Sequence, residues 1–470
     1  MKNSILFFGL FFGQFLLAQT FTDTTEVMID SVSIDTVSVV EFKNEIYNAK
    51  AITRFLQKLD SVESIKQNKV RIVHIGDSHI QADLFSGKMR SLLQEQFGNA
   101  GLGFTFPYNL ASTNGSHYIK YSSSISFSNY RNVKPDEGKP VGLSGIALYT
   151  DKNDFAIELN VRDKSYAFNS IKIVAPIKDN FNLAKTTKNI VIESSKPKVI
   201  YHKIKSGEAL SIIANKYNCT VLEIKKANNL RSNTIQAGKT LRIPTDEKEP
   251  VKITKSEFIP VTIFEDNYSY NYASEESLDK IYITSNDKTT DFSLNGIILE
   301  NNNSGIVYSA IGVNGAKASD YLKYPLFFEQ LQAIEADLVV ISLGTNESFD
   351  KRETAVFYTE LEEMLLSIKK QNPEVEILLT TPPPSLFQRK YPNTFVASYT
   401  KAIIEFAEKN NYAVWDMYRN MGGLYSVNSN AKKGLMSRDK VHYSKQGYEL
   451  QGELFFKALM ETYTNFKSVE

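Results

Sequence analysis

The sequence predicts an α/β protein whose parallel sheet, flanked by helices, is split by an all-β insert. The apolar runs 336–343 and 375–381 suit strands that are buried on both faces of a sheet. Helical spacing of apolar residues recurs after these runs, at 354–370, 395–410 and 445–464. Strands that alternate with helices in this way are typical of a parallel sheet covered by helices.

A first α/β unit is expected at 44–115, ahead of the insert. Within it, 71–75 is a short apolar run typical of a buried strand, and 84–97 has helical spacing. Between the two, the apolar run breaks at Gly76-Asp-Ser-His79. This tetrapeptide is therefore expected at a strand-to-helix turn.

The insert is expected to be a β-sandwich formed by 116–198 and 245–302. Its apolar and polar residues alternate with period two, as in the stretch from Phe155 to Val161. The α/β pattern then returns, and 303–470 is expected to complete the domain that 44–115 begins.

A different pattern interrupts the insert at 199–244. Apolar residues recur at the spacing of one helix face from Leu210 to Tyr217, and both ends of the segment resemble short strands. The segment is therefore expected to be a small, self-contained β-α-α-β unit.

The N-terminus predicts export. Residues 1–18 combine one lysine, a short apolar core and a final small residue, which is typical of a cleaved signal peptide. Residues 19–43 are rich in Thr, Ser, Asp and Val without a stable period, so we interpret them as a linker. We expect a periplasmic or extracellular, cell-wall-associated protein with no integral membrane span after cleavage.

Composition narrows the partners and the chemistry. Lys plus Arg total 54 against 53 for Asp plus Glu, so the charge balance favours neither nucleic acid nor an anionic membrane as partner. With one cysteine, Cys219, no intramolecular disulfide can form. The five scattered histidines show no metal-ligand spacing, so we expect no metal and no other cofactor.

The serine of the tetrapeptide has two interpretations. At a strand-to-helix turn, Ser78 has an exposed hydroxyl and a free backbone N–H, as does an activated nucleophile whose own N–H helps to hold an oxyanion. A helix N-cap has the same properties. On this motif alone the helix cap is the favoured interpretation.

Three later motifs supply the other groups that acyl transfer needs. Val313-Asn-Gly315 and Gly344-Thr-Asn346 each follow a predicted strand. Glycine lets a backbone N–H approach a ligand closely, and an asparagine amide can point a second donor at the same place. Asp439-Lys-Val-His442 precedes the last helix, where the carboxylate can orient an imidazole over the serine.

In this order the four motifs resemble the blocks of the SGNH, or GDSL-like, hydrolases. The resemblance implies a flavodoxin-like, three-layer fold with a parallel sheet, and it implies a serine esterase. By this resemblance Ser78 is the nucleophile, His442 is the general base and Asp439 orients the imidazole.

The resemblance also implies the composition of the oxyanion hole. It would be formed by the backbone N–H groups of Ser78 and Gly315 and by the side-chain amide of Asn346. Gly315 is preferred to Gly312 because Val-Asn-Gly matches the block of the family better.

Four polar residues lie near these motifs in sequence. His79 is expected to be a packed residue that supports the site and takes no direct part in catalysis. Asp83, Glu347 and Asp350 are expected at the solvated rim.

The insert that splits the domain narrows the range of candidate substrates. Gly76-Asp-Ser-His79, together with a carbohydrate-binding-type β-sandwich between the first and second motifs, resembles bacterial peptidoglycan O-acetylesterases. This resemblance implies hydrolysis of the 6-O-acetyl group of N-acetylmuramic acid through an acyl-enzyme on Ser78. The alternatives are an O-acetyltransferase acting on peptidoglycan or exopolysaccharide, an acetyl-xylan-type polysaccharide esterase, and a non-catalytic wall-binding protein.

The unit at 199–244 resembles a LysM domain, which implies peptidoglycan or another N-acetylglucosamine-containing glycan as partner. Its Glu208-Ala209 departs from the usual Asp-Thr, and a role as a mere spacer is the alternative. The resemblance implies that the following residues bind the glycan: Gly207, Glu208, Ala209, Leu210, Asn229, Ile235 and Gly238.

Overall fold

The computed structural model describes residues 42–468 except 136, 177–178 and 195. The predicted signal peptide and all but the last two residues of the predicted linker lie outside the described residues. From Lys43 onward the described chain forms one compact unit.

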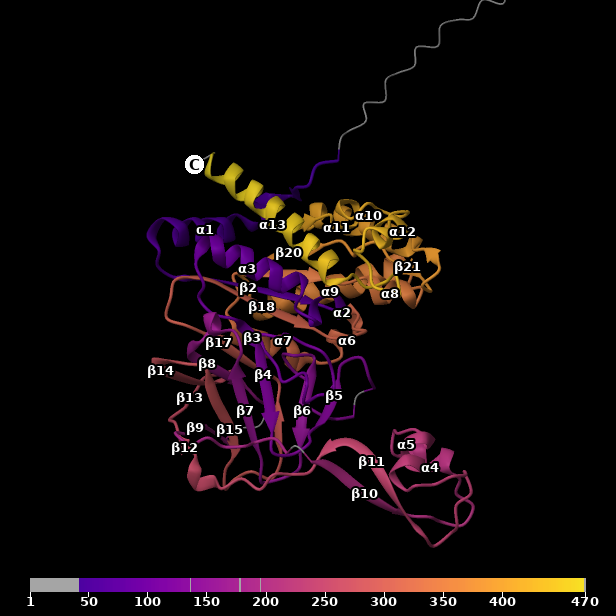
Figure 1. Ribbon diagram of the computed structural model, residues 1–470. Helices are drawn as coiled ribbons and strands as arrows, with labels where there is room; N and C mark the ends of the chain where they lie inside the picture. Colours follow the sequence, from indigo (N-terminus) through magenta and orange to yellow (C-terminus); the bar gives the residue numbers. More distant parts are fainter. Residues whose placement is uncertain (1–41, 136, 177–178, 195, 469–470) are drawn as a thin grey trace, which may run out of the picture. The chain divides into compact units, whose positions relative to one another are not determined.

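The α/β part is built on a six-stranded sheet with the order β1-β23-β20-β19-β2-β18 (Figure 1). Five of its strands are parallel, and the short edge strand β1 runs antiparallel to β23. The strands span Ile46–Tyr47 (β1), Lys69–Gly76 (β2), Gly305–Gly312 (β18), Leu338–Ser342 (β19), Glu376–Thr380 (β20) and Ala413–Trp415 (β23). The predicted α/β class with a parallel sheet is thus confirmed.

Helices cover both faces of this sheet, because successive strand residues point to opposite sides. Ile72 of β2 packs with one buried cluster and Val73 with the other. The first cluster is covered by α1 (Thr53–Ile65), α3 (Phe85–Phe97) and α13 (Lys445–Lys467). The second is covered by α6 (Ala318–Leu322), α7 (Pro325–Leu331), α9 (Thr354–Gln371) and α10 (Thr394–Lys409). The result is the three-layer arrangement that the resemblance implies.

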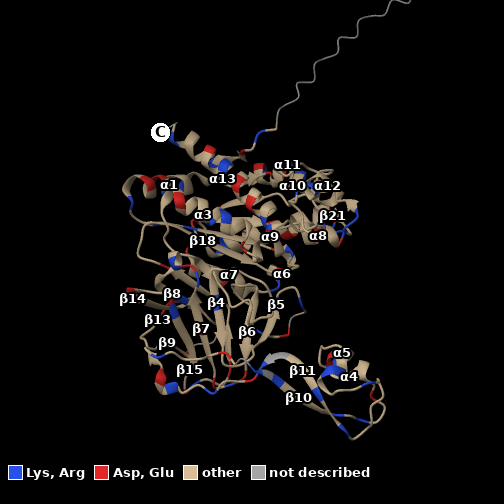
Figure 2. Cartoon of the chain, viewed as in Figure 1, with Lys and Arg blue, Asp and Glu red and all other residues tan. Residues whose placement is uncertain are grey.

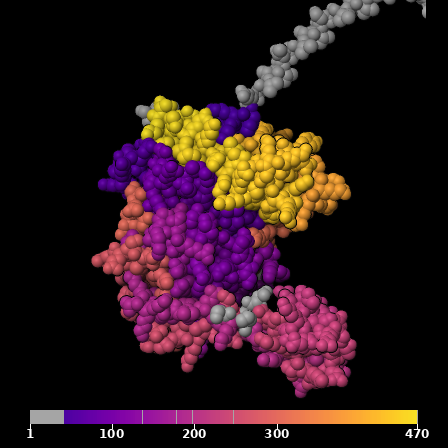
Figure 3. Space-filling view, in the orientation of Figure 1, coloured from indigo at the N-terminus to yellow at the C-terminus, as the bar shows by residue number. Residues whose placement is uncertain are grey.

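Short elements complete this part of the chain. They are η1 (Ala49–Ile52), α2 (Ser78–Gln81), η4 (Gln332–Ile334), α8 (Thr345–Phe349), β21 (Leu386–Phe387), β22 (Tyr391–Pro392), α11 (Met417–Asn420) and α12 (Val427–Lys432). The two sequence segments of the α/β domain form one body, because α13 packs on α3. In Figure 3 the yellow C-terminal segment lies directly against the indigo start of the described chain.

The insert forms three antiparallel sheets, with the orders β12-β9-β15-β7-β4, β13-β14-β8-β17-β3 and β16-β6-β5. Their strands are β3 (Gly103–Thr105), β4 (Ile119–Ser123), β5 (Ser128–Arg131), β6 (Ile146–Thr150), β7 (Ala156–Val161), β8 (Phe168–Val174), β9 (Phe181–Lys185), β12 (Ile259–Pro260), β13 (Phe264–Glu265), β14 (Tyr270–Leu278), β15 (Lys280–Ser285), β16 (Phe292–Leu294) and β17 (Gly296–Glu300). The short helices η2 (Lys164–Tyr166) and η3 (Lys255–Glu257) lie between them. Aromatic rings such as Phe155 and Phe292, whose centroids are 4.8 Å apart, fill the interior.

The boundary between the α/β part and the insert differs from the predicted one at 115/116. Strand β3 lies within 44–115, yet it pairs with β17 of the insert. The backbone N–H of Phe104 also donates to Ser309 Oγ of β18 at 2.9 Å. The two parts share one continuous buried cluster, so β3 joins a sheet of the insert while it packs against the α/β domain.

The segment at 199–244 forms a separate small unit of β10 (Pro197–Lys203), α4 (Leu210–Lys216), α5 (Val221–Ala227) and β11 (Thr240–Lys248). The two strands pair with each other, with Val199 opposite Pro244. The buried residues of the two strands and the two helices, including Ile213 and Ile224, form a separate core. The predicted β-α-α-β order is confirmed.

Charged residues of both signs are interspersed along the helices and strands, as Figure 2 shows. Within the described part of the chain, no helix combines the length and the apolar character needed to cross a bilayer.

Candidate active site

A tight turn at the end of β2 presents Ser78. A Cβ on Gly76 would lie 2.7 Å from the carbonyl oxygen of Ser342, so the turn can approach β19 only with glycine at this position. The Asp77 side chain caps the short helix α2 by accepting from the backbone N–H of His79 at 2.9 Å. The cap is therefore Asp77, and Ser78 begins the helix with its hydroxyl free for another partner.

That partner is His442. Ser78 Oγ lies 2.9 Å from His442 Nε2, and His442 Nδ1 lies 2.7 Å from Asp439 Oδ2. A proton on Nδ1 that is donated to the carboxylate leaves Nε2 free to accept the serine proton. The structure thus brings together the three residues predicted as the triad, in the order that proton transfer requires.

Asp439 is held in place by its own loop. Its Oδ1 accepts from the backbone N–H groups of Val441 and His442, each at 3.0 Å. Partial burial acts to raise the pKa of Asp439, but the hydrogen bonds from the His442 side chain and from these N–H groups outweigh it and lower the pKa. The carboxylate therefore stays charged and fixes the orientation of the imidazole.

Two backbone N–H groups are candidates for the oxyanion hole. Ser78 opens α2, and Gly315 is exposed with φ +86°, where open space surrounds its Cα. Within the described residues, the hydrogen-bond network assigns no acceptor to either N–H. Gly312 instead packs against α2, since a Cβ there would lie 2.3 Å from the nitrogen of Gln81. This difference supports the choice of Gly315 as an oxyanion donor.

Asn346 joins the serine turn to the glycine loop. Its Nδ2 donates to Asp77 Oδ2 and to the carbonyl oxygen of Ala316, both at 3.0 Å. An oxyanion at this position would therefore share a hydrogen that Asp77 or Ala316 already accepts. Asp77 and Ala316 fix the orientation of the Asn346 amide, and its role in the oxyanion hole stays a prediction.

Asp77 is a residue of the site that the sequence reasoning did not single out. It is buried, accepts from Asn346, and lies directly before Ser78. Burial raises the pKa of Asp77 to about 7. The available signal was a polar residue between a buried strand and the serine, which a cap explains equally well.

Two of the three acidic residues expected at the solvated rim are buried. Glu347 is fully buried, its Oε1 accepts from the backbone N–H of Ala318 at 2.9 Å, and burial raises its pKa to about 8. Asp83 forms a buried ion pair with Arg90 at 2.8 Å. Helix α8 is too short for its sequence to reveal which side faces inward, so the prediction for Glu347 was wrong. Asp350 is exposed, as expected.

His79 packs beside the proposed base. Its ring centroid lies 5.2 Å from that of His442, and its Nδ1 lies 2.8 Å from the Tyr448 hydroxyl. Burial lowers the pKa of His79 to about 3, so the ring stays neutral and adds no positive charge next to His442. The packing role predicted for His79 agrees with this environment.

The residues predicted to bind glycan in the unit at 199–244 divide by exposure. Gly207, Ala209, Asn229 and Gly238 are exposed, and Ile235 is half-buried. Leu210 is only 2% exposed and belongs to the small core, so its side chain cannot contact a glycan. The prediction for that side chain was wrong. The sequence does not distinguish a leucine that begins a buried helix face from a leucine in an exposed binding loop.

The carboxylate of Glu208 has hydrogen-bond partners within the unit at 199–244. Its Oε2 accepts from the backbone N–H of Lys205 at 2.7 Å and lies 2.8 Å from His202 Nε2. These contacts lower the pKa of Glu208, the backbone hydrogen bond most strongly. The glutamate that departs from the usual Asp therefore has a structural function in this loop.

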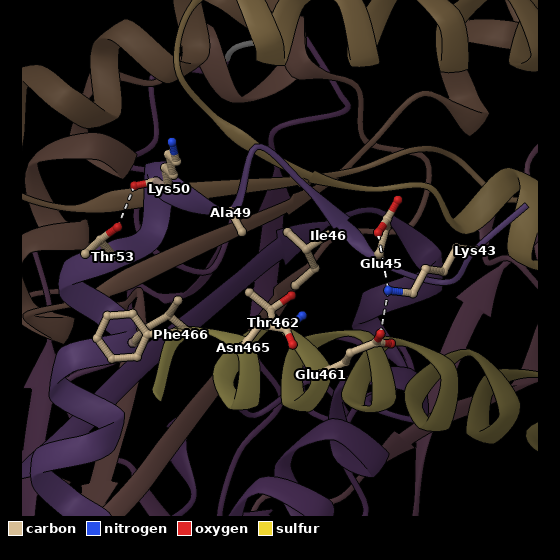
Figure 4. A pocket seen from close by; sticks show the side chains of 11 residues that line it. Lys43, Glu45, Ile46, Ala49, Lys50, Thr53, Glu461, Thr462, Asn465 and Phe466 are labelled. Atoms are coloured by element: carbon tan, nitrogen blue, oxygen red, sulfur yellow. Dashed lines mark hydrogen bonds and ion pairs between the residues drawn. The ribbon is translucent and has the colours of Figure 1, made fainter. Parts of the chain in front are cut away.

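No cluster of three His, Cys, Asp or Glu residues that could hold a metal ion occurs among the described residues. An apolar cavity of about 340 Å³ lies between the start of the described chain and α13 (Figure 4). Its rim carries Lys43, which pairs with Glu45 and Glu461. The residues of the serine site do not line this cavity.

Comparison with known families identifies two parts of the chain. Residues 292–450 match the GDSL-like Lipase/Acylhydrolase family, and residues 202–244 match the LysM domain. The chain contains a GDSL-like acylhydrolase domain and a LysM domain. The acylhydrolase match begins at 292, so Ser78 lies outside it, on the other side of the insert. The predicted nucleophile is thus brought to the matched acylhydrolase region by folding.

A solved structure supports the fold of almost the whole chain. A peptidoglycan O-acetylesterase structure superposes with a TM-score of 0.61 and 20% identity, covering 89% of this chain and 97% of the other. The same arrangement of α/β domain and insert therefore exists in a known protein.

Two further similarities are partial. The lipase/acylhydrolase from Enterococcus faecalis is 25% identical with a TM-score of 0.28, covering 34% of this chain and 77% of its own. Intracellular hyphae protein 1 of Colletotrichum lindemuthianum is 45% identical over 53 residues, which are 11% of this chain. The chain covers 23% of the length of that relative.

Proposed function

We propose that this acylhydrolase is an exported serine esterase that removes O-acetyl groups from a cell-wall glycan, most specifically the 6-O-acetyl group of N-acetylmuramic acid in peptidoglycan. The observation that carries the proposal is the hydrogen-bonded series Ser78–His442–Asp439, with the Asn346 amide bonded to Asp77, the residue before Ser78. Such a set of groups is suited to acyl transfer.

The mechanism follows from these positions. Ser78 Oγ attacks the acetyl carbonyl carbon while His442 Nε2 takes the hydroxyl proton, and the negative charge moves to the carbonyl oxygen. The N–H groups of Ser78 and Gly315, with the Asn346 amide, stabilise that oxygen. The intermediate collapses when His442 returns the proton to the departing sugar oxygen, which leaves acetyl-Ser78.

Water completes the cycle. His442 takes a proton from a water molecule, whose oxygen attacks the acetyl-serine carbonyl, and the same donors stabilise the second intermediate. Collapse releases acetic acid and returns the proton to Ser78. Asp439 remains ionised throughout and stabilises the imidazolium that forms in both steps.

Two observations support a cell-wall glycan as substrate. The chain carries a LysM domain, a type of domain that binds N-acetylglucosamine-containing glycans. The fold of both the α/β domain and its insert matches that of a peptidoglycan O-acetylesterase. Both also support export, because a cell-wall glycan lies outside the cytoplasm.

The test is acetate release from O-acetylated peptidoglycan, compared with the same material after base deacetylation. We expect release from the acetylated material alone, and none with Ser78→Ala. Activity on acetyl-xylan without activity on acetylated peptidoglycan would overturn the proposed substrate. Transfer of acetyl to an added glycan without free acetate would instead assign a transferase.

A further inference from the structure

Two neighbouring cavities lie in the insert. One of about 390 Å³ is lined by residues between Phe106 and Tyr121, with Arg162. The second, of about 330 Å³, is lined by residues around Ser126 and by the end of β11. Asn109 and Glu193 line both cavities, so the two share a boundary.

The first cavity is linked by hydrogen bonds to the loop that carries Gly315. Asn114, which lines it, accepts at Oδ1 from Asn314 Nδ2 at 2.8 Å. Asn314 directly precedes Gly315, and its backbone N–H donates to Gln81 Oε1 at 2.6 Å. Hydrogen bonds therefore connect the lining at one end of the cavity to the loop that carries Gly315, and that loop to the helix that carries Ser78.

The second cavity reaches the root of the LysM domain. Lys248 lines it, ends β11, and forms an ion pair with Glu193. The next residue, Glu249, also lines the cavity, and its backbone N–H donates to the carbonyl oxygen of Lys196 at 2.9 Å. The far end of the second cavity thus lies where the strands of the LysM domain leave the insert.

The lining has the chemistry of a carbohydrate site. Side-chain amides and hydroxyls predominate, and the exposed ring of His117, with its centroid 4.1 Å from that of Tyr118, offers an apolar face. Three basic residues (Lys120, Arg162, Lys248) stand against two acidic ones (Glu193, Glu249), which gives no reason to expect a polyanion. Hydroxyl and N-acetyl groups of a sugar match this set of donors, acceptors and ring faces.

We propose that the two cavities form one groove that binds the unacetylated sugars next to the reacting one, along a glycan strand that runs between the LysM root and Ser78. This inference rests on the proposed function and extends it to substrate length. Binding of several sugars positions the acetyl group at Ser78, so long glycans should react faster than a disaccharide.

The test uses Ser126→Trp in the full chain. Ser126 is exposed in the second cavity, where an indole would fill the groove, and Ser128→Trp, at the next exposed serine outside the cavity lining, is the matched control. For an O-acetylated hexasaccharide of peptidoglycan, we expect kcat/KM to fall about tenfold with Ser126→Trp and to stay unchanged with Ser128→Trp. Both variants should hydrolyse p-nitrophenyl acetate at the normal rate. Equal hexasaccharide rates in the two variants would overturn the groove.

A binding measurement separates this proposal from the proposed function. By calorimetry, the Ser78→Ala protein should bind an unacetylated peptidoglycan hexasaccharide at two sites, the LysM domain and the groove. Adding Ser126→Trp should leave one site, whereas adding Ser128→Trp should leave two. If the groove binds glycan but acetylated peptidoglycan is never hydrolysed, only the proposed function fails. If Ser126→Trp leaves binding unchanged, the groove proposal fails whatever the activity.

Discussion

The acylhydrolase domain and the LysM domain differ in how their candidate functional residues come together. Ser78 and His442 are 364 residues apart in sequence, and only the completed parallel sheet and α13 bring them within 2.9 Å. The LysM domain closes within one short segment, with its own strand pair and its own core. Damage to the first site should therefore stop the chemistry without affecting glycan binding by the LysM domain, and damage to the second should weaken glycan binding without affecting hydrolysis of a small ester.

Ser78→Ala should have the largest effect. Loss of the nucleophile should lower kcat for p-nitrophenyl acetate by at least about 10³-fold, since the remaining groups cannot form an acyl-enzyme. Co-sedimentation with peptidoglycan should be unchanged, because the LysM domain is intact. Activity close to that of the unmodified protein would show that another residue is the nucleophile.

Asn346→Ala should rank second. Removing one oxyanion donor typically costs about 10²–10³-fold in kcat. Steady-state kinetics should show the loss in kcat, with little change in KM for a small ester. Asn410→Ala, at the half-buried C-cap of α10, is a control that should leave kcat unchanged. A normal kcat in Asn346→Ala would exclude this amide from the oxyanion hole.

Replacing 199–244 by a short Gly/Ser linker should separate the two domains in function. The strands of the LysM domain pair with each other, so the insert should still fold without them. The rate on a small soluble ester should be normal, while the rate on insoluble acetylated peptidoglycan should fall about tenfold or more, because tethering raises the local concentration of acetyl groups. Equal rates on the insoluble substrate would make the LysM domain a spacer.

Glu347→Gln should change how the stability of the acylhydrolase domain depends on pH. Burial raises the pKa of Glu347 from about 4.5 to about 8, so between these values the folded protein holds a proton that the unfolded chain has released. The free energy of unfolding therefore falls as pH rises through this window, and the glutamine variant lacks this loss. Relative to that of the unmodified protein, the free energy of unfolding of Glu347→Gln should rise by several kcal/mol from pH 4.5 to pH 8, at about 1.4 kcal/mol for each pH unit.

Urea unfolding across that pH range measures this slope. A difference in unfolding free energy that is the same at every pH measures how well the new amide packs. A difference that changes with pH measures the raised pKa of the buried carboxyl. Parallel stability curves would show that Glu347 is ionised in the folded protein.

Glu208→Gln should have the smallest effect. Glu347→Gln should gain stability as pH rises, whereas Glu208→Gln should lower the stability of the LysM domain at neutral pH. Hydrogen bonds from the Lys205 backbone and from His202 lower the pKa of Glu208, so its carboxylate stabilises the LysM domain above pH 4.5, and this stabilisation is lost as pH falls through the lowered value. Amide hydrogen exchange within 199–244 should be slightly faster in the variant at pH 7, while that of the acylhydrolase domain is unchanged. Equal protection of 199–244 in both proteins at pH 7 would contradict a stabilising role for Glu208.

Features that depend on neighbouring residues were predictable from the sequence. The spacing from Leu210 to Tyr217 predicted the helix face of the LysM domain, since helical periodicity is a local property. The strand before Gly76 and the helix after it followed from the same kind of pattern. The four motifs, taken in order, indicated the acylhydrolase family and predicted which side chains should meet.

Tertiary contacts decided the rest, because they join residues that no local pattern connects. The pairing of β3 with β17 links segments on either side of most of the insert, so the domain boundary could not be read from periodicity. The burial of Glu347 depends on packing around a helix of five residues. The contacts of Asn346 with Asp77 and Ala316 depend on three separate strand ends that meet at one edge of the sheet, and that edge forms only when the split domain closes around its insert.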